Sequence, residues 1–510
     1  MALQFTVDGR HVSVADDGAS LLEVLRDRLG LRTPKDGCSP QGQCGCCTVW
    51  VDGAPRVACV TPARRVAGRD ITTLAGLDPD VRARWGDALC ATGGSQCGFC
   101  TPGIIMRLAA ERASPENALL AHLCRCTGWR TILEAAELAL SPDPIDAAGR
   151  DLAAASTRAG IEGGVPQRVG RDVALGDGGF ADDNAPPDAL VAVPDNQGGW
   201  AVGETLLEAR AAAGKVQGRR TTLDPRWPVE LPAGDWTVAL QTTWTEPAYL
   251  ETDASWCVPG GVPASPLANG GAFGGKSSSP VQEVARRLAD EHGRPVRVLL
   301  SREDTVRLGP KRPPLAAGVR GDGSGSLRAV RTEGLRRAVE QVAPGWEIQE
   351  VDIAGPPTST AIRGAAWLES AVLLAAARED LSIRAPGGGE ASARFDADGA
   401  LSVTVSCGDP LDETVLRSYC TGAAHMGLGL VRSEAIAVDD DGVAHDLTIR
   451  SFGILRAVDT PPIRVDIEPS DGPPVNGSDA VMAAVALAAW RADGLAPRWP
   501  TRRGVQSSGA

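Results

Sequence analysis

The chain has 510 residues, with 51 Lys or Arg against 64 Asp or Glu, so its formal net charge is -13. A chain of this length forms several domains, each with its own core, and a single compact unit is not expected. The negative charge repels phosphate backbones and anionic lipids, which excludes nucleic acids and membrane surfaces as expected partners.

The first 76 residues predict a small α+β unit. Apolar and polar residues alternate over 3–14 around a central turn, as in a β-hairpin, and residues 48–60 repeat the pattern. Ser20 and Glu23 form a capping box that begins a short helix.

The opening residues lack the basic stretch and apolar core of a signal peptide, so we expect a cytoplasmic protein.

Three further regions are expected. Residues 77–140 show apolar positions at helical spacing and predict a helical bundle. Residues 141–176 are rich in Pro, Gly, Asp and Ala and predict a linker. Residues 177–510 alternate strand-like and helical patterns, so we expect a mixed α/β region. The longest apolar run, 481–490, is about half of the roughly 20 residues that a membrane span needs.

Cysteine is unevenly distributed along the chain. Ten of the 13 cysteines lie before residue 127. A reducing cytosol keeps disulfides open, so this clustering favours thiolate ligands for a metal. The cysteines outside the two groups described next, and His425, are expected to be buried core or loop residues; those cysteines are Cys90, Cys257, Cys407 and Cys420.

The first group lies in the loop DGCSPQGQCGCCTV and the hairpin after it. Each iron of a [2Fe-2S] cluster takes two thiolates, and Cys38, Cys44, Cys47 and Cys59 are the natural set, similar to a plant-type ferredoxin site. The ferredoxin spacing is C-x4-C, whereas five residues separate Cys38 from Cys44 here. An exchange of Cys46 for Cys47 stays open, and four cysteines would also satisfy a structural zinc ion.

The second group combines C-x2-C, from Cys97 and Cys100, with C-x-C, from Cys124 and Cys126. A helix beginning near Pro102 places its positive end beside the first pair, which favours thiolate over thiol. The spacing alone also fits a zinc ribbon or a thioredoxin-like redox pair.

Together, QCGFCTPG and LCRCTGW make residues 1–140 resemble the iron-sulfur portion of the xanthine dehydrogenase and aldehyde oxidase family. The resemblance implies a β-grasp ferredoxin-like domain and then a helical-bundle domain, each with one [2Fe-2S] cluster. In that family the bundle's cluster lies nearest the molybdopterin and the ferredoxin-like cluster passes electrons outward. It also implies that Gln96 and Cys126 contact the pterin.

GGAFGGKS at 270–277 satisfies the P-loop pattern, which would indicate a nucleotidase. A P-loop follows a buried strand, but the preceding residues here contain two prolines, which argues against that interpretation. The segment resembles the family's glycine-rich molybdopterin loop, and TAIRG resembles a further active-site loop. The resemblance implies cofactor contacts from Gly271, Phe273, Gly274, Gly275 and Arg363.

Two departures from the family affect the expected chemistry. Residues 177–510 form a molybdopterin-domain-like region of roughly half the family's length. Ser478 stands where the family has a catalytic glutamate, and the neighbouring Asp479 has a shorter side chain. No catalytic residue is therefore assigned, and a working cofactor site and a degenerate scaffold that docks another subunit both stay open.

The sequence thus predicts an oxidoreductase chain that passes electrons through two [2Fe-2S] clusters. The donor would be a molybdopterin centre in this chain or in a partner. No glycine-rich flavin fingerprint is present, so FAD would lie on a partner subunit that acts as acceptor. A homo-oligomer stays open, and the alternative function is a non-catalytic iron-sulfur assembly subunit.

Overall fold

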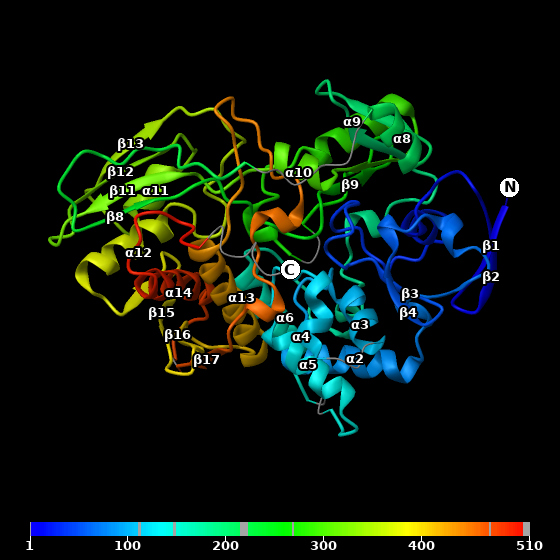
Figure 1. The fold of residues 1–510 in the computed structure, drawn as a ribbon, viewed down its shortest axis with the longest axis horizontal. Helices are drawn as coiled ribbons and strands as arrows, with labels where there is room; N and C mark the ends of the chain where they lie inside the picture. Colours follow the sequence, from blue (N-terminus) through cyan, green and yellow to red (C-terminus); the bar gives the residue numbers. More distant parts are fainter. Residues whose placement is uncertain are drawn as a thin grey trace.

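A computed structural model of the chain describes residues 2–110, 114–145, 149–214, 223–267, 270–468 and 471–502. A five-stranded sheet comes first, then a group of helices, and then a larger mixed region with three four-stranded sheets (Figure 1). The predicted α+β fold class is confirmed. The domain boundaries themselves stay predictions.

The first sheet has the strand order β2-β1-β5-β3-β4. The capping box between Ser20 and Glu23 is present, and it begins a helical segment that buries Leu21 and Leu25 completely against the sheet. The predicted second hairpin is shorter than expected, because a 3-10 turn begins at Ala58 and holds Cys59 in the interior. The elements are β1 (Ala2–Val7), β2 (Arg10–Ala15), α1 (Leu21–Glu23) with a π-helix (Val24–Arg28), β3 (Thr48–Val51), β4 (Ala54–Val57) and β5 (Asp70–Thr72).

The predicted helical bundle follows directly. Helices α2 and α5 pack against each other, and α3 packs on β3, where the Trp50 indole N–H donates to the carbonyl oxygen of Met106 at 2.6 Å. The bundle is therefore joined to the first sheet along one face. Its helices are α2 (Pro79–Thr92), α3 (Thr101–Ala110), α4 (Pro115–Ala118) and α5 (Arg130–Leu140).

The segment expected to be an unstructured linker contains regular structure. Helix α6 (Leu152–Gly163) and helix α7 (Arg171–Ala174) lie within residues 141–176. Helix α6 packs on α13 (Glu413–Arg432), and its buried face carries small residues and an ion pair between Arg158 and Glu162. That face has no large apolar residues at helical spacing, so the sequence pattern did not reveal it.

The C-terminal region is built from three sheets in the orders β7-β6-β10-β9, β13-β12-β11-β8 and β14-β15-β16-β17. Helices α13 and α14 form its centre, with extensive burial along both (Figure 1). The strands are β6 (Leu190–Pro194), β7 (Trp200–Gly203), β8 (Val238–Gln241), β9 (Ala254–Cys257), β10 (Val296–Leu299), β11 (Leu315–Val319), β12 (Gly325–Val330), β13 (Glu347–Val351), β14 (Ser382–Arg384), β15 (Glu390–Phe395), β16 (Leu401–Ser406) and β17 (Ile463–Ile467). The helices are α8 (Leu206–Ala213), α9 (Val281–His292), α10 (Arg302–Leu308), α11 (Leu335–Glu340), α12 (Trp367–Arg378) and α14 (Ser478–Ala492).

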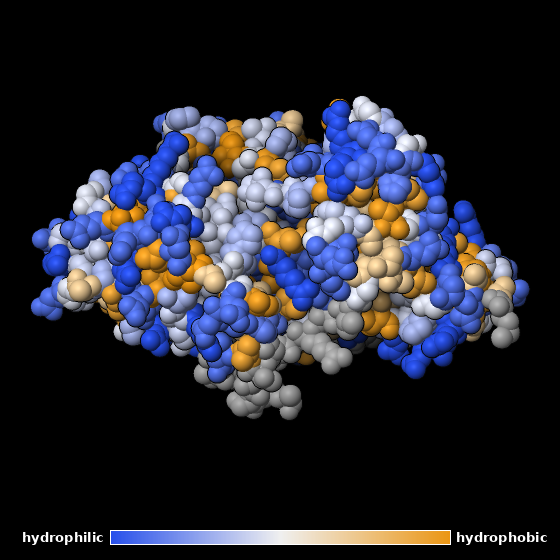
Figure 2. Space-filling model, turned by 90° about the horizontal axis from the view of Figure 1, so that it is seen from above, coloured by the Kyte–Doolittle hydropathy of each residue, from blue (hydrophilic) through white to orange (hydrophobic). Residues whose placement is uncertain are grey.

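Within the residues that the structure describes, no helix has both the length and the apolar character that crossing a membrane requires. The apolar run at 481–490 lies in α14, where its side chains are almost completely buried. On the face seen in Figure 2, hydrophobic residues form separate patches between hydrophilic ones.

The buried ion pair of α6 generates a stability prediction. Glu162→Ala leaves the guanidinium of Arg158 buried without its carboxylate, so the free energy of unfolding should fall by about 3–5 kcal/mol. The control is Glu291→Ala, which removes an exposed partner of Arg287 in α9 and should cost less than about 0.5 kcal/mol. Urea unfolding of the purified variants measures the free energy of unfolding of each. Equal losses in Glu162→Ala and Glu291→Ala would contradict the burial of the Arg158–Glu162 ion pair.

Candidate iron-sulfur centres and the adjoining cavities

The first cysteine group forms a connected set of sulfurs in the interior. The Cys38 side chain is hydrogen bonded to those of Cys44 and Cys59, and the Cys59 side chain is also hydrogen bonded to that of Cys47. The backbone amide of Gln41 donates to the Cys38 sulfur at 3.1 Å, and the amide of Cys59 donates to the Cys47 sulfur at 3.4 Å. The structure therefore brings together the four cysteines that the spacing singled out.

Cys46 occupies a different position from its neighbour Cys47. Its sulfur contacts the carbonyl oxygen of Cys44 at 3.8 Å and is completely buried. Its sulfur is also hydrogen bonded to the sulfur of Cys44, and it interacts electrostatically with Cys38 and Cys47 and with Cys124 of the second group. Cys46 thus lies on the side of the loop that faces the second group, a placement that the sequence spacing did not reveal.

The second group consists of two sulfur pairs. The sulfurs of Cys97 and Cys126 are 3.7 Å apart, and Cys100 is hydrogen bonded to Cys124. The bond from Cys100 lowers the pKa of Cys124 to about 6, with help from the Thr127 hydroxyl at 3.2 Å. One member of this pair is therefore ready to be a thiolate at neutral pH.

Both groups crowd ionisable sulfurs into a region of low polarity. Hydrogen bonds between the sulfurs, together with burial, raise the pKa of Cys44, Cys59, Cys100 and Cys126 above the ordinary value. In the part of the chain that the structure describes, no three His, Cys, Asp or Glu side chains gather as around a single metal ion. The sulfurs of the second group lie in two pairs and those of the first group form a connected set. Each group supplies the four thiolates that the two irons of a [2Fe-2S] cluster require.

The two cysteine loops pack directly on each other. The amide of Leu123 donates to the carbonyl oxygen of Cys44 at 3.0 Å, so one hydrogen bond joins a residue of the first group to the neighbour of Cys124. The contact leaves no room for side chains, because a Cβ atom on Gly103 would lie 2.2 Å from the carbonyl oxygen of Gly45. The His122 imidazole covers Gly45, and burial lowers its pKa to about 3, so it is neutral at pH 7.

A cavity of about 60 Å³ lies beside the second group. Gln96, Cys97, Cys100 and Cys126 line one side, and Gly270 to Phe273 of the glycine-rich loop line another. The side-chain amide of Gln96 donates to the carbonyl oxygen of Cys126 and to the hydroxyl of Ser418, each at 3.0 Å. Four of the residues for which a pterin contact was predicted are therefore brought together here, namely Gln96, Cys126, Gly271 and Phe273.

A second cavity of about 310 Å³ shares Gly271 and Phe273 with the first. Gly274 and Arg363 also line it, so it gathers most of the remaining predicted contacts. Gly275 is not among the lining residues, because it packs on the ring of Tyr249. A Cβ atom added to Gly275 would lie 2.5 Å from that ring. The end of α6 closes one side of this cavity.

The polar groups of the second cavity are already bonded to one another. The Arg363 guanidinium donates to Asp479 at 2.7 Å and to the hydroxyl of Ser478. Glu162 accepts hydrogen bonds from the amides of Gly477 and Ser478, at 3.1 and 2.9 Å, at the start of α14. An arginine and a helix N-terminus are both groups that bind anions, and here the chain's own carboxylates occupy them.

The P-loop-like segment lacks the geometry of a phosphate site. The ammonium group of Lys276 is buried and donates to Glu251 at 2.8 Å and to the carbonyl oxygen of Pro266 at 3.1 Å. Strand β9 ends at Cys257, well before the loop, and α9 begins only at Val281. The lysine therefore points into the protein, in agreement with the argument from the prolines.

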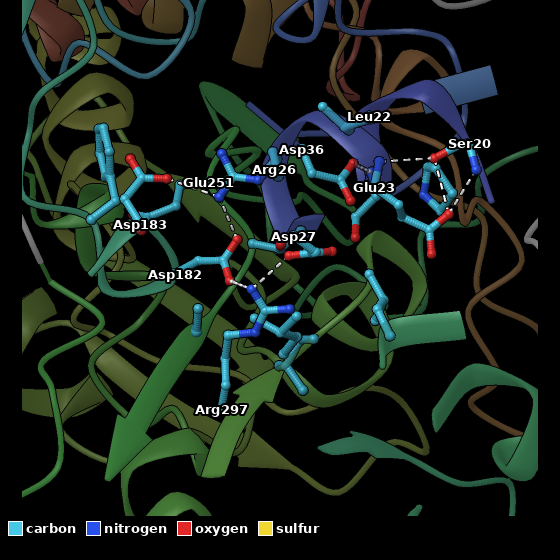
Figure 3. Close-up of a pocket in the computed structure, with 18 of the residues that line it drawn as sticks. Ser20, Leu22, Glu23, Arg26, Asp27, Asp36, Asp182, Asp183, Glu251 and Arg297 are labelled. Carbon is cyan, nitrogen blue, oxygen red and sulfur yellow. Dashed lines mark hydrogen bonds and ion pairs between the residues drawn. The ribbon is translucent and has the colours of Figure 1, made fainter. Parts of the chain in front are cut away.

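A charged cavity lies between the first helical segment, which contains Arg26, and the sheet that contains β9 and β10 (Figure 3). Arg26 donates to Asp182 at 2.7 Å and to Asp183 at 2.8 Å, and Arg297 donates to Asp27 at 3.0 Å. Burial alone would raise the pKa of Asp182, but Arg297 and Arg26 hold it below the ordinary value. These pairs join the first unit to the C-terminal region, and sequence reasoning missed them because their partners lie far apart in the chain.

Comparison with known proteins agrees with this arrangement. A family described as "[2Fe-2S] binding domain" matches residues 73–137. A probable xanthine dehydrogenase subunit of Bacillus subtilis is 37% identical over 142 residues, which cover 26% of this chain and 82% of that protein. The xanthine dehydrogenase iron-sulfur-binding subunit of Escherichia coli O157:H7 is 36% identical over 150 residues, which cover 90% of it. The chain belongs to the xanthine dehydrogenase and aldehyde oxidoreductase family.

The larger members of the xanthine dehydrogenase and aldehyde oxidoreductase family match over a small part of their length. Aldehyde oxidoreductase of Megalodesulfovibrio gigas is 40% identical over 143 residues, and the chain covers 16% of that protein. The solved structure of the aldehyde oxidoreductase from Desulfovibrio gigas aligns over 98% of this chain and 99% of its own, with a TM-score of 0.71 and 15% identity. The family fold therefore continues through the C-terminal region, where sequence identity is low.

His425 and the four cysteines outside the two groups were predicted to be core or loop residues, and the structure places them in the interior. His425 is completely buried in α13, and its Nε2–H donates to the carbonyl oxygen of Leu455 at 3.1 Å. Burial lowers its pKa to about 4. Cys257, Cys407 and Cys420 are buried, and Cys90 is partly buried.

His425 generates a pH prediction. Its pKa is about 4 in the folded chain and about 6.5 when unfolded, so the unfolded state binds the extra proton between these values and stability falls as the pH decreases. From pH 7 to pH 5, wild-type protein should lose about 2 kcal/mol more than His425→Gln, which cannot take up this proton. Urea unfolding at both pH values measures the difference, and parallel losses would contradict the prediction.

Proposed function

We propose that the chain is an electron-transfer protein with two [2Fe-2S] clusters in series. The first cluster is held by Cys38, Cys44, Cys47 and Cys59, and the second by Cys97, Cys100, Cys124 and Cys126. The observation that carries the proposal is the packing of two sets of closely spaced sulfurs against each other across the Leu123–Cys44 hydrogen bond.

The donor sets fit the proposed clusters on chemical grounds. Each group supplies four thiols, and the close approach of these sulfurs makes it costly for all of them to be anionic without a cation among them. Iron supplies that positive charge, and backbone amides donate to the sulfurs of Cys38 and Cys47. When bound, each cluster accepts and gives up one electron at a time.

The chain's own residues define the path between the clusters. Cys126 and Cys97 face the cavity beside the second group, which is the side on which an electron donor would lie. Cys124 and Leu123 lead to the hydrogen bond with Cys44, and the buried Cys46 fills the space beside it. The interior position of these residues excludes water from the path. A cluster held by the first group would lie between the second group and an acceptor.

Two observations oppose a working molybdenum centre in this chain. Arg363 and the start of α14 would have to bind an anionic cofactor, but they are bonded to Asp479 and Glu162. Ser478 stands in place of a catalytic carboxylate, and its hydroxyl, which accepts a hydrogen bond from Arg363, is not basic enough to take a proton. The residues do not fit the group, and we assign no hydroxylation step to this chain.

The donor and acceptor are therefore proposed to be partner subunits. The relatives from Bacillus subtilis and Escherichia coli are named as subunits of xanthine dehydrogenases. By analogy, we propose a molybdopterin-containing subunit as the donor and a flavin-containing subunit as the acceptor, with the C-terminal region as the docking scaffold.

The ligand assignment is tested by paired alanine variants. Dithionite-reduced wild-type protein should give two distinct [2Fe-2S] signals in low-temperature electron paramagnetic resonance. Cys47→Ala should lose about half of the bound iron and one signal, because it removes a ligand of the first cluster. Cys46→Ala is the matched control and should keep both signals. A loss of iron only in Cys46→Ala would show that the neighbouring cysteine is the ligand.

The absence of a molybdenum centre is tested by elemental analysis. Protein purified from a host that makes molybdopterin should contain the iron of both clusters but molybdenum far below one atom per chain. One molybdenum per chain, with pterin, would contradict this expectation and support a hydroxylase site in the 310 Å³ cavity.

A further inference from the structure

Arg302, the first residue of α10, is a completely buried cation at the edge of the first cysteine loop. One of its terminal nitrogens, Nη2, donates to the carbonyl oxygens of Gly37 at 2.8 Å and Leu250 at 2.7 Å. Its other two nitrogens, Nε and Nη1, have no hydrogen-bond partner among the described residues. The guanidinium is therefore held by neutral carbonyl groups.

The position of Gly37 brings this charge close to the sulfurs. Gly37 directly precedes Cys38, and a Cβ atom on it would lie 3.2 Å from the Cys44 sulfur. A single peptide unit therefore lies between the guanidinium of Arg302 and the first cysteine group. Gly37 also packs against Phe99 and the carbonyl of Leu250, so this peptide unit lies in the packed interior.

The carboxylates near Arg302 are bonded to other groups. Glu246 pairs with Lys311 at 3.0 Å and attracts Arg302 only electrostatically, without a hydrogen bond, and Asp253 accepts the hydroxyl hydrogen of Tyr249 at 2.7 Å. The Tyr249 ring lies 5.9 Å from the guanidinium carbon and adds a weak attraction at most.

Other deeply buried arginines differ in this respect. Arg125, beside the second group, is bonded to Glu434 by both terminal nitrogens, at 2.5 and 2.7 Å. Arg26 and Arg297 each bond to aspartates at the charged cavity. Arg302 bonds to no carboxylate within the described residues. A buried charge of this kind is costly to the fold, which calls for a compensating role.

The chemistry of a cluster supplies such a role. Reduction adds one negative charge to a [2Fe-2S] centre, and net charge, hydrogen bonds and exposure set its reduction potential. A cation in the low-dielectric interior stabilises that added charge much more than an exposed cation does.

We propose that Arg302 raises the reduction potential of the first cluster by stabilising its reduced state electrostatically. This inference rests on the proposed function, because it needs a cluster at the first cysteine group. Arg302 touches neither a sulfur nor an iron position, and it acts through the peptide unit of Gly37 as a positioning residue.

Arg450 provides a matched comparison on the same loop. Its Nε donates to the carbonyl oxygen of Gln43 at 2.9 Å, and it too bonds to backbone carbonyls without a carboxylate partner in the described part of the chain. Arg450 reaches the surface, so solvent and salt screen its charge more than that of Arg302, although it also interacts electrostatically with Cys38 and Cys44. Removing each arginine in turn separates the effect of a buried cation from that of an exposed one.

The test is a redox titration of the full-length protein, followed by electron paramagnetic resonance. The two cluster signals are assigned with Cys47→Ala and Cys124→Ala. In Arg302→Gln, the ratio of oxidised to reduced first cluster at the wild-type midpoint should rise about tenfold, which is about 59 mV for a one-electron couple. The second cluster should shift less. Arg302→Lys keeps the charge and should stay within about twofold of the wild-type ratio.

The control variant removes the cation that reaches the surface. Arg450→Gln should change the ratio by less than about threefold, and high salt should reduce this change more than it reduces the change in Arg302→Gln. Equal potentials in Arg302→Gln and wild type, with both clusters present, would overturn the inference. A tenfold shift in Arg302→Lys would also overturn it, and this holds even if Arg302→Gln does not fold. Absence of the first cluster from wild-type protein would instead refute the proposed function.

Discussion

The crowding of thiols in the interior is the constraint on which the rest of this structure depends. The sulfurs lie in two sets, close enough for hydrogen bonds between them, and Cys44, Cys59, Cys100 and Cys126 have a pKa above the ordinary value in the absence of a cation. Positive metal ions remove this penalty, because they bind thiolates and balance their charge. The small loops, the glycines at the contact and the buried His122 all follow from packing two such sets together.

The C-terminal region combines a family fold with a cavity whose polar groups bond to one another. Its architecture aligns with aldehyde oxidoreductase over nearly the whole chain. The groups that could bind an anion are nevertheless satisfied internally, since Glu162 caps α14 and Asp479 pairs with Arg363. Carboxylates inside the protein have thus taken the place that an external anion would need. This arrangement supports the proposal that the C-terminal region serves as a scaffold.

Electrostatics also distinguishes the two cysteine groups. A neutral ion pair, Arg125 with Glu434, lies beside the second group, whereas the guanidinium of Arg302 lies beside the first with only carbonyl partners. A buried arginine therefore adds a net positive charge beside the first group, whereas the carboxylate of Glu434 cancels the charge of the arginine beside the second. Burial makes the distinction matter, because surface charges are screened and buried ones are not.

The sequence by itself determined the local features. The spacing of cysteines indicated the two groups, alternation indicated the first hairpins, and the motifs QCGFCTPG and LCRCTGW indicated the family, because each depends on residues close together in the chain. Only the tertiary structure decided which way Cys46 faces, that α6 is ordered, and that Glu162 and Arg302 lie where they do. Those outcomes depend on contacts between residues that are distant in sequence, such as Arg302 with Gly37, and no local pattern encodes them.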